Sequence, residues 1–295
     1  MTTRAEHGSA VIMAMLVVAA TATLISGALW QQSALIRETE NELAYAQAKW
    51  LLRGAIDWAG VILLEDGRTS SVDHRGEPWA VPLADTRLNE GDARPAAYLA
   101  GAIDDEQGKL NLRNLVAGDQ VNPSQLAALG RLLGMLGIDE AFADAIAARL
   151  MAAQRAGNAQ PDPARAFIEE LLDVGLGADA MERLRPFLTL LPETTPLNVN
   201  TASAEVLAAS IPGLTLLDAR RIVAARSRAY FRDLADALQR LREAGAAANG
   251  DGLSVATRYF SIDGTVTYAR ARLEGRALVK RDANRLEVIW IRELG

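Results

Sequence analysis

Residues 8–36, GSAVIMAMLVVAATATLISGALWQQSALI, contain no charged side chain, and the part from Ser9 to Trp30 is almost wholly apolar. A transmembrane helix needs about 20 such residues. The polar leader before this stretch carries Arg4 and the amino terminus as its cations, whereas Arg37 is the first charge after it. Because the cations beside a span stay in the cytoplasm, we expect one transmembrane helix with most of the chain outside the cytoplasm.

A secretory signal peptide is the alternative interpretation of the same stretch. Such a peptide has a shorter apolar region of about 7–15 residues, followed by a cleavage site of small residues. Ser26-Gly27-Ala28 could serve as that site. Cleavage near Ala28 would release a secreted globular protein instead of an anchored one.

The boundary between leader and span, His7-Gly8-Ser9-Ala10-Val11-Ile12, favours the anchored interpretation. A glycine at this place resembles the processing site of type IV pilins and of the pseudopilins of type II secretion. In those families a prepilin peptidase cuts after the glycine and N-methylates the next residue. The resemblance implies cleavage after Gly8 and a mature amino terminus at Ser9.

The fifth position of the mature chain departs from this pattern. These families usually have glutamate there, whereas this chain has Met13. A glutamate could pair with the amino terminus of a neighbouring subunit inside a dry helix bundle, where an unpaired charge is expensive. Because Met13 cannot pair in this way, we expect the subunit at the end of a filament, where no such neighbour exists.

Composition narrows the classes of function. The 295 residues carry a net charge of -6 and include no cysteine. Disulfides, thiol catalysis and zinc–thiolate sites are therefore excluded, and no overall charge attracts the chain to nucleic acid. The two histidines, His7 and His74, have no nucleophile or metal-ligand partner nearby in the sequence. We expect no active site and no enzymatic activity.

The span continues as an amphipathic helix. Apolar residues recur about every 3.6 residues from Leu35 to Ile62, and the charges fall mainly on the other face. No proline interrupts the pattern before Pro78. One helix from near Ser9 to near Leu64, ended by Asp66-Gly67, is therefore expected rather than two helices.

Beyond this helix, β-like segments flank a helical block. Helices are predicted over residues 123–136, 139–154, 164–174 and 178–191. Strands are predicted over residues 98–103, 109–112, 258–262, 265–274, 278–281 and 286–291. Asp263-Gly264 and Glu274-Gly275 are interpreted as tight turns between strands. This order favours one α+β domain with a helical insertion, whose flanking strands pack on the long helix.

Residues 201–226 look like a helix-hairpin-helix unit, with Thr201 as the expected N-cap and Gly213 in its turn. Such units bind DNA phosphates through backbone amides, and Thr215 stands where that use favours a second glycine. Arginines and acids offset one another here: Arg220, Arg221, Arg226 and Arg228 against Glu205, Asp218, Asp233 and Asp236. We expect a structural hairpin; a membrane-anchored DNA-binding uptake protein is the alternative function.

The acidic sequence Asp104-Asp105-Glu106 lies in a predicted hairpin-like turn that ends near Gly108. Calcium binds several carboxylate and carbonyl oxygens, so this turn is a candidate calcium site. A solvated turn without metal is the preferred interpretation, because charged side chains are common at exposed turns.

Several motifs, in this order, resemble one family, the general secretion pathway protein K minor pseudopilins of type II secretion. Beside Gly8/Ser9 and Met13, the motifs are Val72-Asp73-His74-Arg75-Gly76-Glu77-Pro78-Trp79, Asp104-Asp105-Glu106-Gln107-Gly108-Lys109-Leu110-Asn111-Leu112, Pro196-Leu197-Asn198-Val199-Asn200-Thr201-Ala202 and Thr257-Arg258-Tyr259-Phe260. The resemblance implies a pilin-like α+β fold, in which the long N-terminal helix packs on an antiparallel sheet and a large all-α domain is inserted. The implied parts are a leader (1–8), a transmembrane part (9–30), a pilin domain (31–121 and 246–295) and an inserted helical domain (122–245).

The same resemblance implies a function. Proteins of this family are placed at the tip of a periplasmic pseudopilus, where they cap or initiate the filament and support protein export across the outer membrane. The implied partners are the I-type and J-type minor pseudopilins, the major pseudopilin, the prepilin peptidase and the inner-membrane assembly platform. The implied location is the bacterial inner membrane, crossed once, with the bulk of the chain in the periplasm.

One feature of the family is missing from the sequence. Family members usually have an Asp-rich calcium-binding loop inside the helical domain. The corresponding stretch here, Leu150 to Phe167, has Asp162 as its only acid. Calcium is coordinated by about six to eight oxygen ligands. We therefore expect that this chain has lost the calcium site and binds no cofactor.

Overall fold

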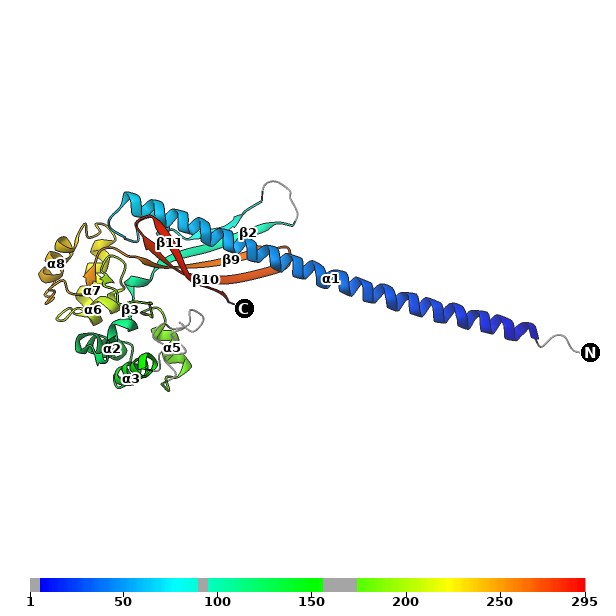
Figure 1. The fold of residues 1–295 in the computed structure, drawn as a ribbon, viewed down its shortest axis with the longest axis horizontal. Coiled ribbons are helices and arrows are strands. Elements are labelled where there is room, and N and C mark those ends of the chain that lie inside the picture. Colours follow the sequence, from blue (N-terminus) through cyan, green and yellow to red (C-terminus); the bar gives the residue numbers. More distant parts are fainter. Residues whose placement is uncertain (1–5, 90–94, 156–173, 295) are drawn as a thin grey trace, which may run out of the picture.

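A computed structural model describes residues 6–89, 95–155 and 174–294, with side chains from Ala10 onward. Its dominant element is helix α1 (Glu6–Thr69), 64 residues long, and the prediction of one continuous helix is confirmed (Figure 1). The helix runs past Asp66-Gly67, where it was predicted to stop. A Cβ at Gly67 would lie 3.2 Å from Cδ of Arg281. This glycine therefore allows a close approach and does not end the helix.

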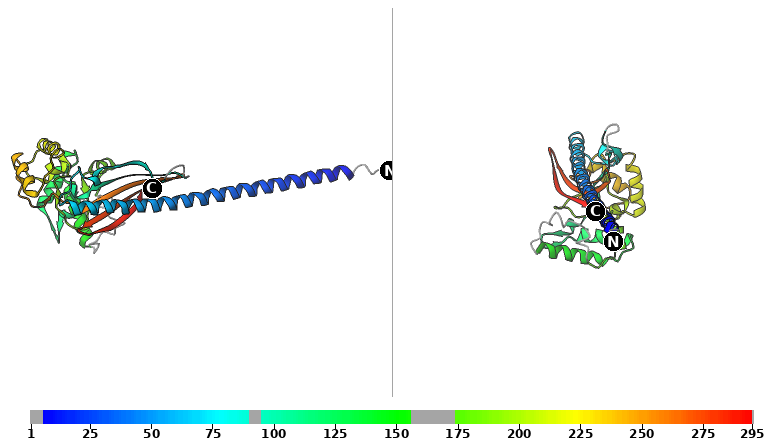
Figure 2. Two further views of the ribbon diagram at one scale, coloured as in Figure 1. Left: turned by 90° about the horizontal axis from the view of Figure 1, so that it is seen from above. Right: turned by 90° about the vertical axis from the view of Figure 1, so that its right-hand side faces the viewer.

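The two halves of α1 have different surroundings. Every side chain from Ala10 to Leu43 is exposed, and this half projects away from the rest of the molecule (Figure 2). From Ala44 onward one face is buried, and Leu52 and Leu63 pack on a sheet. The first half of α1 is long and apolar enough to cross a membrane.

The sheet has five antiparallel strands in the order β1-β2-β9-β10-β11. The strands are β1 (Leu83–Arg87), β2 (Ala97–Asp105), β9 (Tyr259–Tyr268), β10 (Ala271–Asp282) and β11 (Arg285–Leu294). The helical part lies between β2 and β9 in the chain, and these two strands pair with each other. The insertion therefore leaves and re-enters the sheet at neighbouring strands, and the fold is the predicted α+β arrangement.

The two segments predicted as turns lie in the middle of the sheet, where three glycines are adjacent to one another. Asp263-Gly264 and Glu274-Gly275 lie within β9 and β10, so their interpretation as turns is wrong. Gly101, Gly264 and Gly275 stand side by side on adjacent strands. A Cβ would lie 2.8 Å from Leu52 at Gly264 and 2.6 Å from it at Gly275. These glycines let α1 approach the sheet, which is a recognised use of glycine in strands.

A side chain at Gly275 is expected to push α1 off the sheet. Gly275→Val would place atoms against Leu52 and the Arg292 carbonyl, and overpacking of this kind costs about 1–3 kcal/mol. Gly54→Val is the matched control, because an added Cβ there meets nothing within 4 Å. Urea unfolding of the full chain in detergent measures both variants. Equal stability of the two would contradict the close approach of α1.

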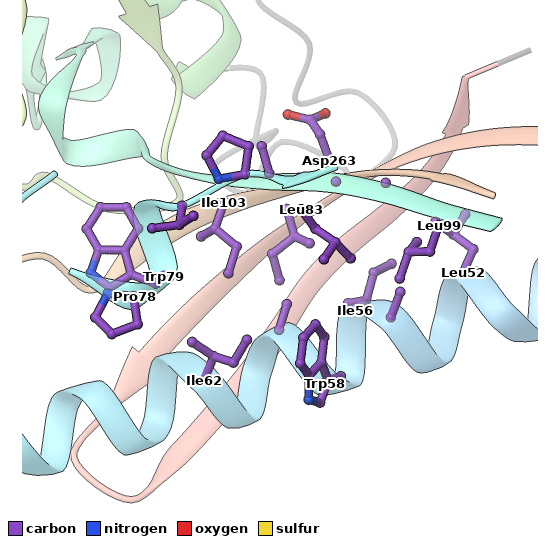
Figure 3. A pocket seen from close by; sticks show the side chains of 18 residues that line it. Leu52, Ile56, Trp58, Ile62, Pro78, Trp79, Leu83, Leu99, Ile103 and Asp263 are labelled. Atoms are coloured by element: carbon purple, nitrogen blue, oxygen red, sulfur yellow. The ribbon is translucent and has the colours of Figure 1, made fainter. Parts of the chain in front are cut away.

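An apolar groove of about 240 Å³ lies between α1 and the β1–β2 side of the sheet (Figure 3). One wall comes from α1 and the other from strands β1 and β2 with the 3-10 turn η1 (Pro78–Ala80) before them. Leu83 and Ile103 face Ile62 across it, and Trp58 stands on the helix at its edge. Side chains therefore leave part of the helix–sheet interface unfilled.

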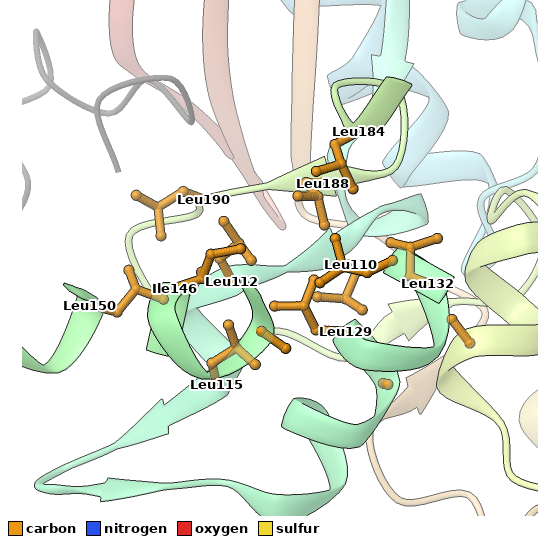
Figure 4. Packing of buried hydrophobic residues seen from close by; sticks show 14 of the residues in the cluster. Leu110, Leu112, Leu115, Leu129, Leu132, Ile146, Leu150, Leu184, Leu188 and Leu190 are labelled. Atoms are coloured by element: carbon orange, nitrogen blue, oxygen red, sulfur yellow. The ribbon is translucent and has the colours of Figure 1, made fainter. Parts of the chain in front are cut away.

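Among the described residues, the helical part contains two hydrophobic cores. The first packs α2 (Pro123–Met135), α3 (Phe142–Arg155) and α5 (Ala178–Leu184) around leucines such as Leu110 and Leu188 (Figure 4). The second packs α6 (Ala204–Ser210), α7 (Leu216–Arg226) and α8 (Leu234–Glu243). The short elements are η2 (Glu106–Gly108), β3 (Leu110–Asn111), η3 (Leu112–Leu115), β4 (Val116–Ala117), β5 (Gln120–Val121), β6 (Leu188–Thr189), β7 (Leu197–Asn198) and β8 (Leu253–Ser254).

Several boundaries in the helical part differ from the predictions. The helix predicted over 178–191 ends at Leu184, because β6 leaves it to pair in parallel with β3. Residues 110–121 thus pack with the helical part, before its predicted start at 122. At the other end, β8 pairs with β7 beyond the predicted limit of 245. The helix predicted over 164–174 lies, apart from Val174, outside the described residues.

Candidate functional site

A buried polar cluster connects α1, the sheet and the helical part, and we call it the junction. Its members are each at most 9% exposed: Asp66, Asp73, Glu77, Asp105, Asn198, Thr201, Thr257 and Arg281. The four sequence motifs that carry the family resemblance meet here, although Asp73 and Thr257 are 184 positions apart. The four motifs are therefore separate in the sequence but form one contact network in the structure.

Asp105, at the end of β2, is the centre of one half of the junction. Its two carboxylate oxygens accept hydrogen bonds from four donors: Thr201 Oγ1 (2.5 Å), Thr257 Oγ1 (2.7 Å), Asn198 Nδ2 (2.9 Å) and the backbone N–H of Gln107 (2.7 Å). A buried carboxylate is tolerated when such donors replace its water. The interpretation of residues 104–106 as a solvated turn is therefore wrong, since Asp105 and Glu106 are both buried.

Arg281, on β10, neutralises the other half of the junction. Its guanidinium donates to the carboxylates of Asp66, at 2.9 Å, and Asp73, and to the carbonyl oxygens of Leu63 and Thr257. Asp66 lies in the last turns of α1, so this one side chain ties the helix end to the sheet. Hydrogen-bonded pairing is what makes a buried charge tolerable.

Burial raises the pKa of three acids of the junction, Asp66, Asp73 and Asp105. It raises the pKa of Asp66 from its ordinary 3.8 to about 6, and repulsion from Glu77 adds to that rise while the Arg281 bond opposes it. Burial likewise raises the pKa of Asp105 to about 6, against the lowering effect of the Thr201 and Thr257 bonds. The pKa of Asp73 is raised for the same reason.

These pKa shifts predict a pH dependence of stability. A carboxyl whose pKa is raised on folding binds its proton more tightly in the folded state, so the contribution of that group to the free energy of unfolding falls as pH rises from about 4 to about 6. Asp105 has this sign, with a pKa of about 6 against 3.8. We expect wild type to lose more stability than Asp105→Asn over this range, in urea titrations at both pH values. Parallel pH profiles would contradict the shift.

Asp66, Asp73 and Glu77 also form an acidic group whose ligand atoms lie within 4.8 Å of one another. Three carboxylates at this spacing could hold a cation. Arg281 already bonds two of them, and Glu77 accepts from Trp79 Nε1 at 2.8 Å. We assign the group to charge pairing within the protein.

His74 has partners that the sequence did not reveal. Its ring stacks on Tyr230, from the loop after α7, with centroids 3.8 Å apart and an interplanar angle of 16°. Its Nε2 also lies 3.9 Å from Oε1 of Glu77. The sequence did not show the stacking contact because Tyr230 is remote from His74 in the chain. The stack attaches the loop after α1 to the second helical core.

The helix-hairpin-helix unit packs within the second hydrophobic core of the helical part. Ser203, not Thr201, is the N-cap of α6, because Thr201 donates to the junction. At the turn, a Cβ on Gly213 would lie 3.2 Å from the Gly245 carbonyl oxygen, so the chain itself covers this side of the hairpin. Arg226 is buried and donates to two backbone carbonyls. None of these observations favours the DNA-binding alternative.

The predicted processing residues lie at the opposite end of the molecule. Gly8 and Ser9 are in the first turns of α1, and Met13 follows with 64% of its surface exposed. Cleavage and N-methylation there stay predictions. The calcium loop was expected to be missing from Leu150 to Phe167. Residues 156–167 of this stretch, including Asp162, lie outside the described residues. Sequence reasoning missed Asp66 and Arg281, which lie outside the motifs.

Comparisons with known proteins give a consistent result. Residues 108–193 and 197–256 match two family models, both described as type II secretion system protein K, and these ranges coincide with the two helical cores. Type II secretion system protein K of Pseudomonas aeruginosa is 32% identical over an alignment of 304 positions, which covers 91% of this chain and 87% of that protein.

A solved structure has a similar fold. It is a crystal structure of the GspK-GspI-GspJ complex from the type 2 secretion system of enterotoxigenic Escherichia coli. The alignment has a TM-score of 0.65 and 19% identity, and it covers 88% of this chain and 99% of that chain. At this identity the likeness shows the shared fold alone.

Proposed function

The chain belongs to the family of type II secretion system protein K, and we propose that it works as a minor pseudopilin anchored in the bacterial inner membrane by α1. The leader before Ser9 faces the cytoplasm, and the sheet and helical part are periplasmic. The uncovered first half of α1 supports this proposal. Its apolar side chains need lipid or other apolar helices around them.

We propose that this subunit stands at the tip of the pseudopilus, where it caps or initiates the filament. The helical part lies beyond the end of α1 that is distant from the N-terminus (Figure 1). In a filament of parallel helices this bulky part would block the place of a further subunit above it. Met13, in place of the usual glutamate, agrees with a terminal position.

The role we assign to the helical part is structural, not enzymatic. The junction holds the helical part to the sheet through hydrogen bonds in which donors and acceptors of the protein satisfy one another. The four hydrogen bonds to Asp105 illustrate this. A rigid joint suits a cap that must transmit force or position from the helix bundle to its outer surface. The single observation that carries the tip assignment is the position of the helical part beyond the end of α1 that is distant from the N-terminus (Figure 1).

The partners we propose are the I-type and J-type minor pseudopilins, followed by the major pseudopilin; the prepilin peptidase and the inner-membrane assembly platform act on the chain earlier. The E. coli complex supports the first two, since it contains GspI and GspJ with a chain of this fold. Co-expression of the tagged full chain with both minor pseudopilins tests this. We expect all three to co-purify from detergent; purification of the tagged chain alone would contradict the proposal.

Calcium is not expected to bind. The stretch Leu150 to Phe167 supplies one acid, Asp162, for an ion that wants about six to eight oxygens. Isothermal titration of calcium into the full chain in detergent, after chelator treatment, should give only the heat of dilution. Saturable binding in the micromolar range that disappears in Asp162→Asn would show that the site is retained.

A further inference from the structure

Helices α7 and α8 lie at the end of the molecule opposite the N-terminus (Figure 1). A second groove, of about 450 Å³, is lined by residues of both helices and of their connection, and we call it the α7–α8 groove. Ile222, Ala225, Phe231 and Ala244 form its apolar lining, and charged side chains complete it. An apolar lining with a few polar groups is the usual composition of a ligand site.

This end of the chain is basic, although the protein as a whole is acidic. Residues 216–244, from the start of α7 to the residue after α8, contain seven arginines and four acids, a net charge of +3. The whole chain carries -6, so the remaining residues carry -9. A local excess of one charge attracts and orients a partner of the opposite charge. The charge of the α7–α8 end therefore favours an acidic partner.

Arg240 is held in a fixed position in the wall of the groove. Its Nε and Nη2 donate to the Asp236 carboxylate at 2.8 and 2.9 Å, and its Nη1 donates to the Ala229 carbonyl oxygen at 3.0 Å. Its guanidinium also lies over the Phe231 ring, 5.3 Å from the centroid. Because a guanidinium has five N–H donors, these bonds leave one N–H on each Nη for a ligand. A donor that is already oriented loses little entropy on binding.

Two further arginines extend the basic wall along α7. Arg221 lines the groove, with 72% of its side chain exposed. Arg228 follows Ala225 by three residues, and its backbone N–H donates to the Ala225 carbonyl oxygen at 3.1 Å, so the helical turn continues to it. This spacing places Arg228 on the face of the groove. Its side chain forms no ion pair within the part of the chain that the structure describes.

The two acids that line the groove already have partners in the protein. Asp218 accepts hydrogen bonds from Arg221, at 3.0 Å, and from the Thr215 hydroxyl, at 2.6 Å. Glu243 accepts a hydrogen bond from Gln239 at 3.0 Å. The arginine donors described above remain for a ligand, so the groove favours a carboxylate over an amine.

We propose that the α7–α8 groove binds an acidic segment of a partner protein. A large apolar side chain of that segment packs on the apolar lining beside Ile222, and a neighbouring carboxylate accepts hydrogen bonds from Arg240. Nucleic acid has the negative charge but no apolar side chain for the lining, so a protein segment fits better. The site goes beyond the proposed function, because neither anchoring nor capping of a filament requires it.

A peptide selection on the full chain in detergent tests the class of ligand. A phage library of random linear peptides is selected on the wild-type chain and, in parallel, on Ala225→Trp, whose indole fills the groove without a change of charge. We expect wild type to enrich sequences with an aromatic or large aliphatic residue beside acids, at least about tenfold over the variant. No enrichment over the variant, or enrichment of basic sequences, would overturn the proposal.

Two charge reversals then locate the site. Arg228→Glu changes the charge at the groove, and Arg220→Glu makes the same change on the side of α7 that faces α6, where Arg220 lies 3.7 Å from Glu205. The anisotropy of a fluorescein-labelled copy of the selected peptide measures its affinity. We expect the affinity to fall at least about tenfold with Arg228→Glu and to stay within about threefold with Arg220→Glu.

The remaining outcomes each contradict one part of the proposal. Equal losses with both reversals would show a diffuse attraction and refute the groove as the site. Tighter binding to duplex DNA, or to vesicles of anionic phospholipid, than to the selected peptide would refute an acidic protein segment as the ligand. Because these measurements use the chain without other pseudopilins, their failure is distinct from failure of the co-purification that tests the proposed function.

Discussion

Arg281→Met is expected to lower the free energy of unfolding by about 3–5 kcal/mol, because it leaves buried carboxylates without their counter-charge. Arg281 bonds both Asp66 and Asp73, and Glu77 lies beside them. Methionine keeps much of the side-chain volume, so the loss reflects charge more than packing. Urea unfolding of the full chain in detergent, followed by tryptophan fluorescence, measures it.

Two controls separate this effect from general damage to β10. Arg272→Met removes an arginine on the same strand whose ion pair with Glu274 is exposed, and such pairs contribute about 0–1 kcal/mol. In the double variant Arg281→Met/Asp73→Asn, part of the lost stability should return because one unpaired acid is removed. A cost for Arg281→Met no larger than that for Arg272→Met would contradict the role assigned to the junction.

Gly8→Leu is expected to abolish maturation and, with it, protein export. The leucine side chain occupies the position that the peptidase is expected to accept only as glycine, so the chain keeps its leader. With the leader attached, its Arg4 stays tethered to the membrane face, and the helix cannot move out of the lipid into a bundle. Immunoblots of membranes should show only precursor, and a strain relying on this variant should secrete as little as one lacking the gene.

Gly27→Leu is the matched control for that variant. Gly27 lies within the span, where an added Cβ meets nothing within 4 Å, and leucine suits a lipid-facing helix. Processing and export should be retained. If Gly27→Leu blocked processing while Gly8→Leu did not, the site would be the small-residue sequence at Ser26 to Ala28, and the chain would be a secreted globular protein.

The long helix could be predicted because its information is local. An uncharged stretch of sufficient length, followed by a regular apolar repeat without proline, specifies a helix whatever surrounds it. The α+β order followed from the same kind of pattern. The N-cap of α6 was misplaced by two residues, because Thr201 and Ser203 are both good caps and only the contact of Thr201 with Asp105 decides between them.

The errors have a common physical cause, which is a partner far away in the chain. Gly264 and Gly275 looked like turn residues, yet they are glycine because Leu52 of α1 packs on them. Asp105 looked like a solvated acid, yet its hydroxyl donors come from Thr201 and Thr257. No local pattern encodes such partners. Arg281 is the clearest case, since it meets Asp66 215 positions away.

The motifs that carry the family resemblance nevertheless contain six of the eight residues of the junction, all but Asp66 and Arg281. The sequence alone could not show why these motifs occur together. The resemblance rests on four short segments, identified by their residues and their order. In the structure, residues of all four segments form hydrogen bonds with one another in the junction. Buried polar groups need specific partners in specific geometry, so each segment constrains the others. The family signature therefore records how the helical part is fixed to the sheet.

The most direct test of the account is the amino terminus of the mature protein. The full chain, expressed with its prepilin peptidase and extracted from membranes, is analysed by intact-mass and tandem mass spectrometry. The account predicts a chain that begins at Ser9, carries one methyl group on its terminal nitrogen and keeps all of α1 from that residue onward. A chain that begins after Ala28, or that still contains residues 1–8 when the peptidase is active, would contradict it.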